Sequence, residues 1–172
     1  MQHKTLFLLR HAKAEQDIEV VDWLRPLKKR GVRAAKHMGA WLTEQNIHPE
    51  LIISSPAKRA LSTAKKVCQA MDRSSSDIRQ DERIYNATLE LLYQVIQECP
   101  ASAQSILIVG HNPSLEEFLK DVSQDEIEEA PDGKLLPTTA LAQLEITIPW
   151  AEIRAKSASY QGITRIKEIE GL

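Results

Sequence analysis

Two short apolar stretches, each ending at a histidine, decide how this chain folds. The first is Thr5-Leu6-Phe7-Leu8-Leu9, followed by Arg10-His11, and the second is Ser105-Ile106-Leu107-Ile108-Val109, followed by Gly110-His111-Asn112. Continuous apolar runs of this length are typical of strands in a parallel sheet whose two faces are both covered. Both stretches therefore predict central strands, each with a polar turn at its carboxyl end.

Helical patterns alternate with the strands. Apolar residues recur at helical spacing between Val32 and Leu42, and Leu51-Ile52-Ile53 is the next strand. Ser54-Ser55-Pro56 then offers a capping hydroxyl and a proline suited to the first turn of a helix with an apolar stripe from Ala60 to Met71. The later segments are a brief strand at Ile78, a helix over Leu89–Ile96 closed by Pro100, a helix carrying Leu115, Phe118 and Leu119, an acidic surface loop over Ser123–Pro137 and a strand over Ala140–Ile146. The end of the chain is ambiguous, and we expect a short helix over Trp150–Arg154 and an edge strand over Ser157–Ile169.

This alternation predicts an α/β fold, a three-layer α/β/α sandwich with a mostly parallel, mixed sheet. The chain has 172 residues, of which 42% are hydrophobic, and it shows no internal repeat or linker. We therefore expect residues 1–172 to form a single domain. In such sheets, ligands gather beyond the carboxyl ends of the strands.

Composition excludes several classes of protein. The formal charge is −2, whereas a nucleic-acid binder would show a basic excess over the whole domain. No apolar run approaches the roughly 20 residues of a membrane helix and no secretory signal is present, so we expect a cytoplasmic protein. Cys68 and Cys99 lack metal-binding spacing and are expected to be small buried residues. The six glycines are too scattered for a dinucleotide or Walker loop, so phosphate chemistry would have to use side chains.

The basic residues are concentrated in the first half of the chain. Residues 1–86 carry 16 Lys/Arg and 10 Asp/Glu, which suggests an anionic ligand. Much of this excess is the cluster Lys28, Lys29, Arg30, Arg33 and Lys36, which falls within a few helical turns. We favour the interpretation that this cluster is the solvated face of a helix.

Polar residues interrupt the apolar pattern at three strand ends, at Arg10-His11, at Ser54 to Arg59 and at Gly110-His111-Asn112. The carboxyl ends of parallel strands share one edge of the sheet, so two histidines and two arginines can face a common crevice. Guanidinium groups match phosphate oxygens, and Arg59 also lies in the first turn of a helix, where the exposed amides attract anions. A neutral imidazole can attack phosphorus. The group therefore supplies a nucleophile and charge stabilisation without a metal or other cofactor.

In these motifs the chain resembles the histidine phosphatase superfamily, whose fold is phosphoglycerate mutase-like. The resemblance is carried by Leu9-Arg10-His11-Ala12-Lys13-Ala14, by Ser54-Ser55-Pro56 leading to Arg59-Ala60 and Thr63-Ala64, and by Val109-Gly110-His111-Asn112-Pro113. Ala12 in place of glycine, Arg25-Pro26-Leu27 before Gly31, and Leu136-Pro137-Thr138-Thr139-Ala140 are similar to the SixA-type phosphohistidine phosphatase branch. The resemblance also implies one antiparallel strand, which we expect after Pro137.

By matching position, the resemblance implies that His11 is the nucleophile that forms a covalent phosphohistidine. Arg10, Arg59 and His111 would bind the phosphoryl group, with His111 as a cation, and we add Asn112 to the phosphate-binding set.

Larger members of the superfamily carry an acid a few positions after an aspartate that here resembles Asp81. This chain has Asn86 near that position, which puts a dedicated proton donor in doubt and suits a substrate with a good leaving group. Glu82 is a possible displaced donor, although a solvated turn residue is the favoured interpretation.

Other polar residues are weaker candidates. His3, His37 and His48 lack comparable neighbours and are not expected to bind metal. Arg25 and Lys13 could reach a phosphate or pair with an acidic residue among Glu15, Asp17 and Asp22, and the sequence favours neither. Structural roles are favoured for Ser54 as a helix cap and for Thr139.

The leading functional hypothesis is a metal-independent phosphatase that acts on protein phosphohistidine. Its partner would be a phosphohistidine-bearing protein of a phosphorelay or phosphotransferase system, with no nucleic acid or membrane involved. The alternatives are a small-molecule phosphomonoesterase of the same superfamily, with a small phosphorylated substrate, and a catalytically weak module that binds phosphoproteins.

Overall fold

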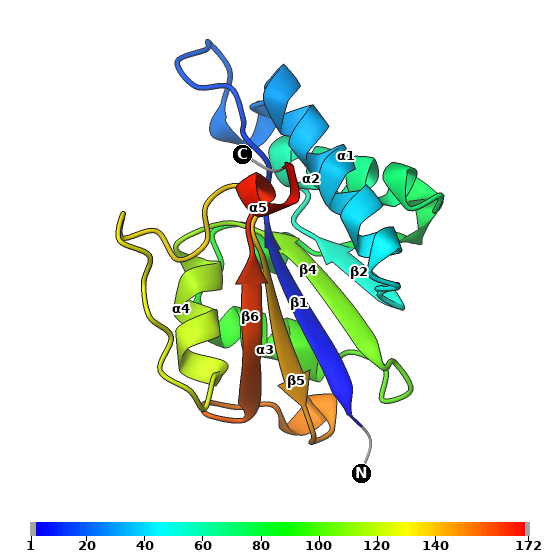
Figure 1. The fold of residues 1–172 in the computed structure, drawn as a ribbon, viewed down its shortest axis with the longest axis vertical. Coiled ribbons are helices and arrows are strands. Elements are labelled where there is room, and N and C mark those ends of the chain that lie inside the picture. Colours follow the sequence, from blue (N-terminus) through cyan, green and yellow to red (C-terminus); the bar gives the residue numbers. More distant parts are fainter. Residues whose placement is uncertain (1–2, 171–172) are drawn as a thin grey trace.

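A six-stranded sheet forms the centre of the molecule, with strands in the order β3-β2-β4-β1-β5-β6. We describe residues 3–170 of a computed structural model (Figure 1). The strands are β1 (Lys4–Arg10), β2 (Leu51–Ser54), β3 (Ile78–Gln80), β4 (Ser105–Gly110), β5 (Leu141–Ile146) and β6 (Ala158–Thr164). The helices are α1 (Lys29–Glu44), α2 (Lys58–Ala70), α3 (Leu89–Gln97), α4 (Ser114–Val122) and α5 (Ile166–Glu170).

The sheet is mixed, as predicted. Strand β1 pairs in parallel with β4, β4 with β2, and β2 with β3. Strand β5 runs antiparallel to both β1 and β6, so it alone among these strands opposes the others. This confirms the antiparallel strand expected after Pro137.

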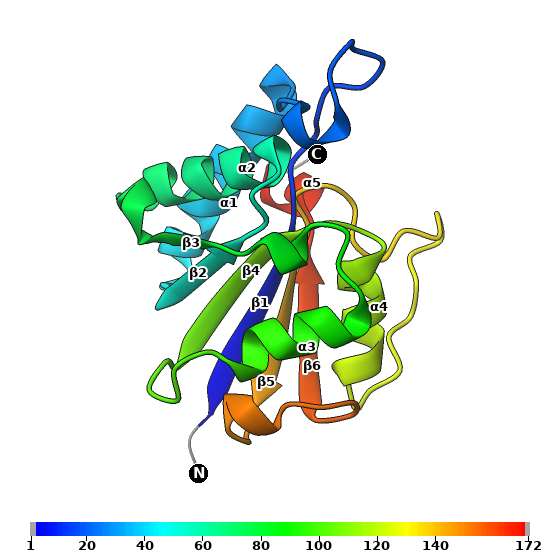
Figure 2. The same cartoon turned by 180° about the vertical axis from the view of Figure 1, so that it is seen from behind.

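Both faces of the sheet are covered, which explains the unbroken apolar runs. Leu6 and Leu8 of β1 join the core formed with α3 and α4, whereas Phe7 and Leu9 join the core formed with α1 and α2. Figures 1 and 2 show these helix pairs from opposite sides of the sheet. Trp150, in a short 3-10 helix (Trp150–Glu152), is fully buried in the core formed with α3 and α4. The three-layer α/β/α sandwich is therefore confirmed.

Two local predictions were wrong. Helix α2 begins at Lys58 with Ala57 as its N-cap and no side-chain cap, so neither Ser54 nor Pro56 has the predicted role. The Ser54 hydroxyl instead donates to the backbone carbonyl of Ser55. At the other end of the chain, the strand predicted over Ser157–Ile169 stops at Thr164, because the residues that follow turn into α5 and pack Ile169 against the α1 side of the core.

Other predictions concern the surface and the interior. Cys68 and Cys99 are free and buried, as expected. The acidic residues from Asp125 to Glu129 are exposed, also as expected. Among residues 3–170, none of the helices combines the length and the apolar character needed to cross a bilayer.

Candidate active site

The register of β1 and β4 brings the two candidate histidines together. Arg10 pairs with Gly110, and the backbone N–H of His11 donates to the Gly110 carbonyl at 3.0 Å. The next residue on each strand therefore leaves the sheet at the same edge, and the centroids of the His11 and His111 rings lie 5.2 Å apart. Both residues are buried, so the crevice predicted at the carboxyl ends of the strands contains both imidazoles.

His11 is held as a neutral imidazole with one free lone pair. Its Nδ1 lies 2.8 Å from the carbonyl of Ala12, which only accepts, so Nδ1 carries the proton and Nε2 bears the lone pair. Burial and, to a smaller extent, the nearby arginines Arg59 and Arg10 lower the pKa of His11 to about 4. At neutral pH, His11 thus has the protonation state that a nucleophile requires.

The backbone beside His11 is tied to helix α2. The N–H of Ala12 donates to Thr63 Oγ1 at 2.9 Å, and that hydroxyl donates to the Arg59 carbonyl at 2.7 Å. Thr63 is fully buried, so this link is shielded from water. It connects the end of β1 to the first turn of α2, where Arg59 lies, and fixes the nucleophile relative to the arginine.

His111 is a neutral imidazole when no anion is bound beside it. Burial lowers the pKa of His111 to about 3, with a smaller contribution from His11, so the free site holds it neutral at pH 7. Its Nε2 lies 2.8 Å from Ser55 Oγ, and Ser55 Oγ accepts from the Ala57 N–H. A phosphoryl dianion beside the ring would favour the imidazolium and raise this pKa.

Arg59 is buried, with its side chain only 8% exposed, and is oriented by Asp22. Its Nη2 donates to Asp22 Oδ2 at 3.0 Å and its Nη1 donates to the Asp22 carbonyl at 2.9 Å. Tyr85 Oη donates to the same carboxylate at 2.7 Å, and the Arg59 guanidinium lies over the Tyr85 ring. This hydrogen bond from Tyr85 and those from the arginines hold the pKa of Asp22 well below its usual range.

Arg10 and Asn112 both bind one peptide group of the loop before β5. Arg10 Nη1 donates to the Leu136 carbonyl at 3.0 Å, Asn112 Nδ2 donates to it at 2.9 Å, and the Leu136 N–H donates to Glu116 at 2.7 Å. The Asn112 amide nitrogen therefore binds the protein backbone in this structure. Arg10 uses one N–H group in the same way and has others left for a ligand. Thr139 closes the same loop, because its N–H donates to the carbonyl of Arg10.

Three buried nitrogens at this edge have no hydrogen-bond partner among residues 3–170, and the two on arginine are donors. They are Arg10 Nε, Arg59 Nε and His111 Nδ1. Buried polar atoms are normally paired, so such a group of donors around His11 calls for an acceptor-rich ligand. A phosphoryl group, with its oxygens and negative charge, matches both the donors and the guanidinium charge.

The residues at the positions where larger relatives carry an acid are paired or exposed. Asp81 is held by Arg83 at 2.8 Å, a hydrogen bond that lowers the pKa of its carboxyl, and Arg83 also binds Glu98. Glu82 and Asn86 are exposed. Within residues 3–170, no cluster of histidine, cysteine and acidic side chains is arranged to hold a metal ion.

The remaining candidates lie outside the crevice or have other partners. His3 pairs with Glu145, His37 pairs with Glu170, and His48 is an exposed turn residue. Arg25 forms one of the acidic pairs that the sequence allowed, because its Nε lies 3.0 Å from Asp22 Oδ1.

Sequence reasoning missed two parts of the site. Asp22 was considered only as a partner for Arg25 or Lys13, whereas it also anchors Arg59. Tyr85 stacks edge-on against His111, with centroids 5.6 Å apart, and against Trp23, with centroids 4.7 Å apart. No local pattern marks either contact, because each joins loops far apart in the sequence.

The fold and the family comparison place this chain in a known superfamily. Residues 6–91 match the histidine phosphatase superfamily (branch 1), and the chain belongs to this superfamily. Within it, the chain groups with the SixA-type branch. It is 27% identical to a candidate phosphohistidine phosphatase SixA from Nakamurella multipartitia, with a TM-score of 0.80 over 96% of this chain and 97% of the other. The corresponding candidate from Agrobacterium tumefaciens is 26% identical, with a TM-score of 0.79 over 94% and 97%.

A protein of unknown role from Mycobacterium tuberculosis is also similar. It is 28% identical over 158 residues, which cover 90% of this chain and 97% of the relative. The matches span nearly the full length of both chains, so the crevice and the surrounding loops are compared along with the sheet.

Proposed function

We propose that this protein is a phosphatase that hydrolyses phosphohistidine on a protein substrate through a covalent intermediate on His11. The observation that carries the proposal is the set of buried, unpartnered donors around the free Nε2 of His11. A phosphoryl group attacked by Nε2 would lie beside the His111 ring, whose centroid is 5.2 Å from that of His11, and would offer its oxygens to these donors. They would stabilise the charge that develops on its oxygens during transfer.

The reaction has two steps, and His11 is regenerated at the end. In the first step, Nε2 of His11 attacks phosphorus, a P–N bond forms to His11, and the P–N bond to the substrate imidazole breaks. In the second step, water attacks the phosphorus of phospho-His11, the P–N bond to Nε2 breaks, and inorganic phosphate leaves. The protons released by water pass to phosphate and to solvent, and His11 returns to its neutral form.

The absence of an acid at Asn86 favours a phosphoramidate over a phosphoester. An alkoxide leaving group needs a proton on its oxygen as the bond breaks. A phosphohistidine protonated on its other ring nitrogen leaves as neutral imidazole, with no proton delivered at the breaking bond. Asp81 is paired with Arg83 and Glu82 is exposed, so neither is placed to protonate an alkoxide leaving group.

Label transfer tests the covalent step. The protein is mixed with a protein substrate carrying radioactive phosphohistidine and quenched in base, and we expect acid-labile, base-stable label on wild type and none on His11→Ala. His48→Ala removes an exposed histidine outside the crevice and should be labelled like wild type. Label retained on His11→Ala would contradict the proposal.

A comparison of leaving groups tests the substrate class. Phosphate release is measured from the phosphohistidine protein, from a phosphoserine peptide and from a sugar phosphate at equal concentration. We expect the phosphohistidine protein to be hydrolysed fastest by at least about a hundredfold, since general acid catalysis is worth roughly 10²–10⁴. Faster release from either phosphoester would assign the protein to the phosphomonoesterases instead, and binding of the phosphohistidine protein without label or phosphate release would indicate a binding module.

A further inference from the structure

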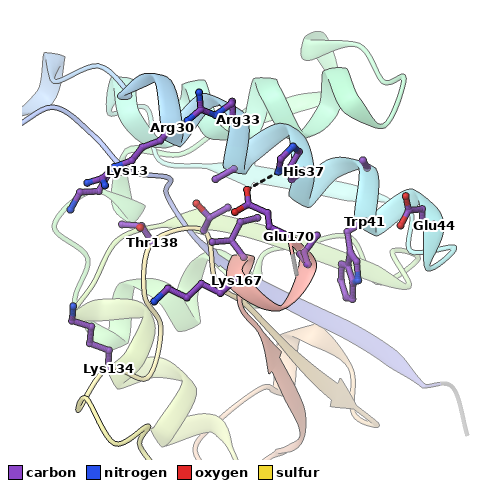
Figure 3. A pocket seen from close by; sticks show the side chains of 15 residues that line it. Lys13, Arg30, Arg33, His37, Trp41, Glu44, Lys134, Thr138, Lys167 and Glu170 are labelled. Carbon is purple, nitrogen blue, oxygen red and sulfur yellow. Dashed lines mark hydrogen bonds and ion pairs between the residues drawn. The ribbon is translucent and has the colours of Figure 1, made fainter. Parts of the chain in front are cut away.

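A groove runs along helix α1 from the edge of the crevice. Its volume is about 1020 Å³, and it lies between one face of α1, the loop before β5, and α5 (Figure 3). Thr139, which lines the groove, donates its backbone N–H to the carbonyls of both Arg10 and His11. One end of the groove therefore lies next to the backbone of Arg10 and His11, at the carboxyl end of β1.

Cationic side chains from four separate segments line one half of the groove. They are Lys13 after β1, Arg30 and Arg33 on α1, Lys134 in the loop before β5, and Lys167 on α5 (Figure 3). In residues 3–170, none of the five forms an ion pair with an acidic side chain, whereas His37 and Glu170 pair with each other farther along. Five unneutralised cations give this half of the groove a strong positive potential.

Packing fixes the start of the groove. A Cβ added to Gly31 would lie 2.2 Å from the Lys13 carbonyl, so the chain after β1 and the first turn of α1 touch through their backbones. The N–H of Lys28 donates to the same carbonyl at 2.9 Å. Burial and the repulsion of Arg30, Lys28 and Arg10 lower the pKa of Lys13.

The dimensions of the groove suit a short extended peptide. Its lining on α1 extends from Arg30 to Glu44, a span of about 20 Å at roughly 1.5 Å per residue. An extended chain of about six residues has that length at roughly 3.3 Å per residue. Two small residues, Ala34 and Ala40, also line the groove on α1 and leave room for a bound chain.

From this geometry we infer that the groove binds an acidic segment of the protein substrate next to its phosphorylated residue. The inference rests on the proposed function, since it assigns to that substrate a flank rich in aspartate and glutamate. The carboxylates would pair with Arg30, Arg33, Lys134 and Lys167 while the phosphoryl group lies at His11. The charged flank therefore adds affinity and selects among phosphohistidine proteins.

Matched peptides test the inference. One peptide carries a histidine flanked on both sides by glutamates, and the second has glutamine at each of these positions. Both are phosphorylated on histidine with phosphoramidate, and kcat/KM is measured for wild type, for Arg33→Glu/Lys167→Glu, and for Lys29→Glu/Lys36→Glu. Lys29 and Lys36 are exposed residues of the same helix that do not line the groove, so the last variant controls for net charge.

We expect wild type and the Lys29→Glu/Lys36→Glu control to prefer the glutamate peptide by about tenfold, as a few exposed ion pairs would give. The preference should disappear in Arg33→Glu/Lys167→Glu and weaken in wild type as salt is raised. Equal kcat/KM values for the two peptides with wild type would overturn the inference. So would a preference that survives in Arg33→Glu/Lys167→Glu.

A binding measurement separates this inference from the proposed function. Fluorescent, unphosphorylated forms of the two peptides are titrated with each protein and followed by anisotropy, so no turnover is needed. If neither phosphopeptide is hydrolysed but the glutamate peptide still binds at least several-fold tighter than the glutamine peptide, the groove assignment holds and the substrate proposal fails. Binding of tripolyphosphate without binding of the glutamate peptide would overturn the inference in favour of a small polyanion.

Discussion

The protonation state of His11 gives the sharpest test of the site. Burial lowers its pKa to about 4, against about 6.5 for an unperturbed histidine. At pH 5, a group with a pKa of 4 is about 90% neutral, whereas a group with a pKa of 6.5 is about 3% neutral. The structure therefore predicts roughly thirtyfold more nucleophilic imidazole at pH 5 than an exposed histidine would supply.

The titration can be followed directly by NMR. The Cε1–H signals of His11 and His111 are assigned by their loss in His11→Asn and His111→Asn, and their shifts are recorded from pH 8 to pH 3.5. The buffer contains no phosphate or sulfate, because a bound dianion would raise both pKa values. We expect both midpoints below pH 5, and addition of inorganic phosphate should move the His111 midpoint upward. A His11 midpoint at or above pH 6 would refute the reasoning.

Three further predictions concern stability and binding. The pKa of His11 is depressed in the folded state, so its contribution to stability is complete above about pH 6.5 and is lost as the pH falls towards 4. We expect the free energy of unfolding in urea to fall by about 3 kcal/mol over this range. Equal unfolding free energies at pH 7 and pH 4.5 would contradict this prediction. Gly31→Ala places a methyl group against the Lys13 carbonyl and should lower the unfolding free energy by roughly 1–3 kcal/mol, whereas unchanged stability would mean that the helix moves freely. Asp22→Asn removes the negative charge that competes with an anionic ligand for Arg59. We expect the inhibition constant of vanadate to fall roughly three- to tenfold in this variant. Weaker inhibition would show that the carboxylate is needed to orient the guanidinium.

The sheet was predictable because its strands carry a strong local signal. Leu6 to Leu9 and Ile106 to Val109 are buried on both faces, so their apolar runs identify central strands without knowledge of the neighbours. Once these strands are adjacent and parallel, Arg10 pairs with Gly110 and the two histidines must leave the sheet side by side. The core of the site therefore followed from two runs of sequence and one rule about parallel strands.

The rest of the site depends on contacts that have no local pattern. Ser55 fits the sequence signature of a helix cap, yet its hydroxyl lies against His111, because the chain extends two residues further before α2 begins. Asp22 and Tyr85 are far apart in the sequence, and they contact each other and Arg59 of α2 only in the folded protein. The sequence also could not predict the pKa of His111 in the free site, because this pKa depends on how deeply the ring is buried.

The two arginines resolve a conflict that burial creates at this edge of the sheet. Desolvation keeps His11 neutral and nucleophilic, but it also makes a phosphoryl dianion costly to bring in. Arg10 and Arg59 each use some N–H groups on fixed protein acceptors, the Leu136 carbonyl and Asp22, and each keeps a buried Nε without an acceptor among residues 3–170. Their orientation is thus set before a substrate arrives, so little reorganisation is needed when charge develops on the transferred group. The same burial that lowers the pKa of the nucleophile then strengthens each charged hydrogen bond to the phosphoryl oxygens.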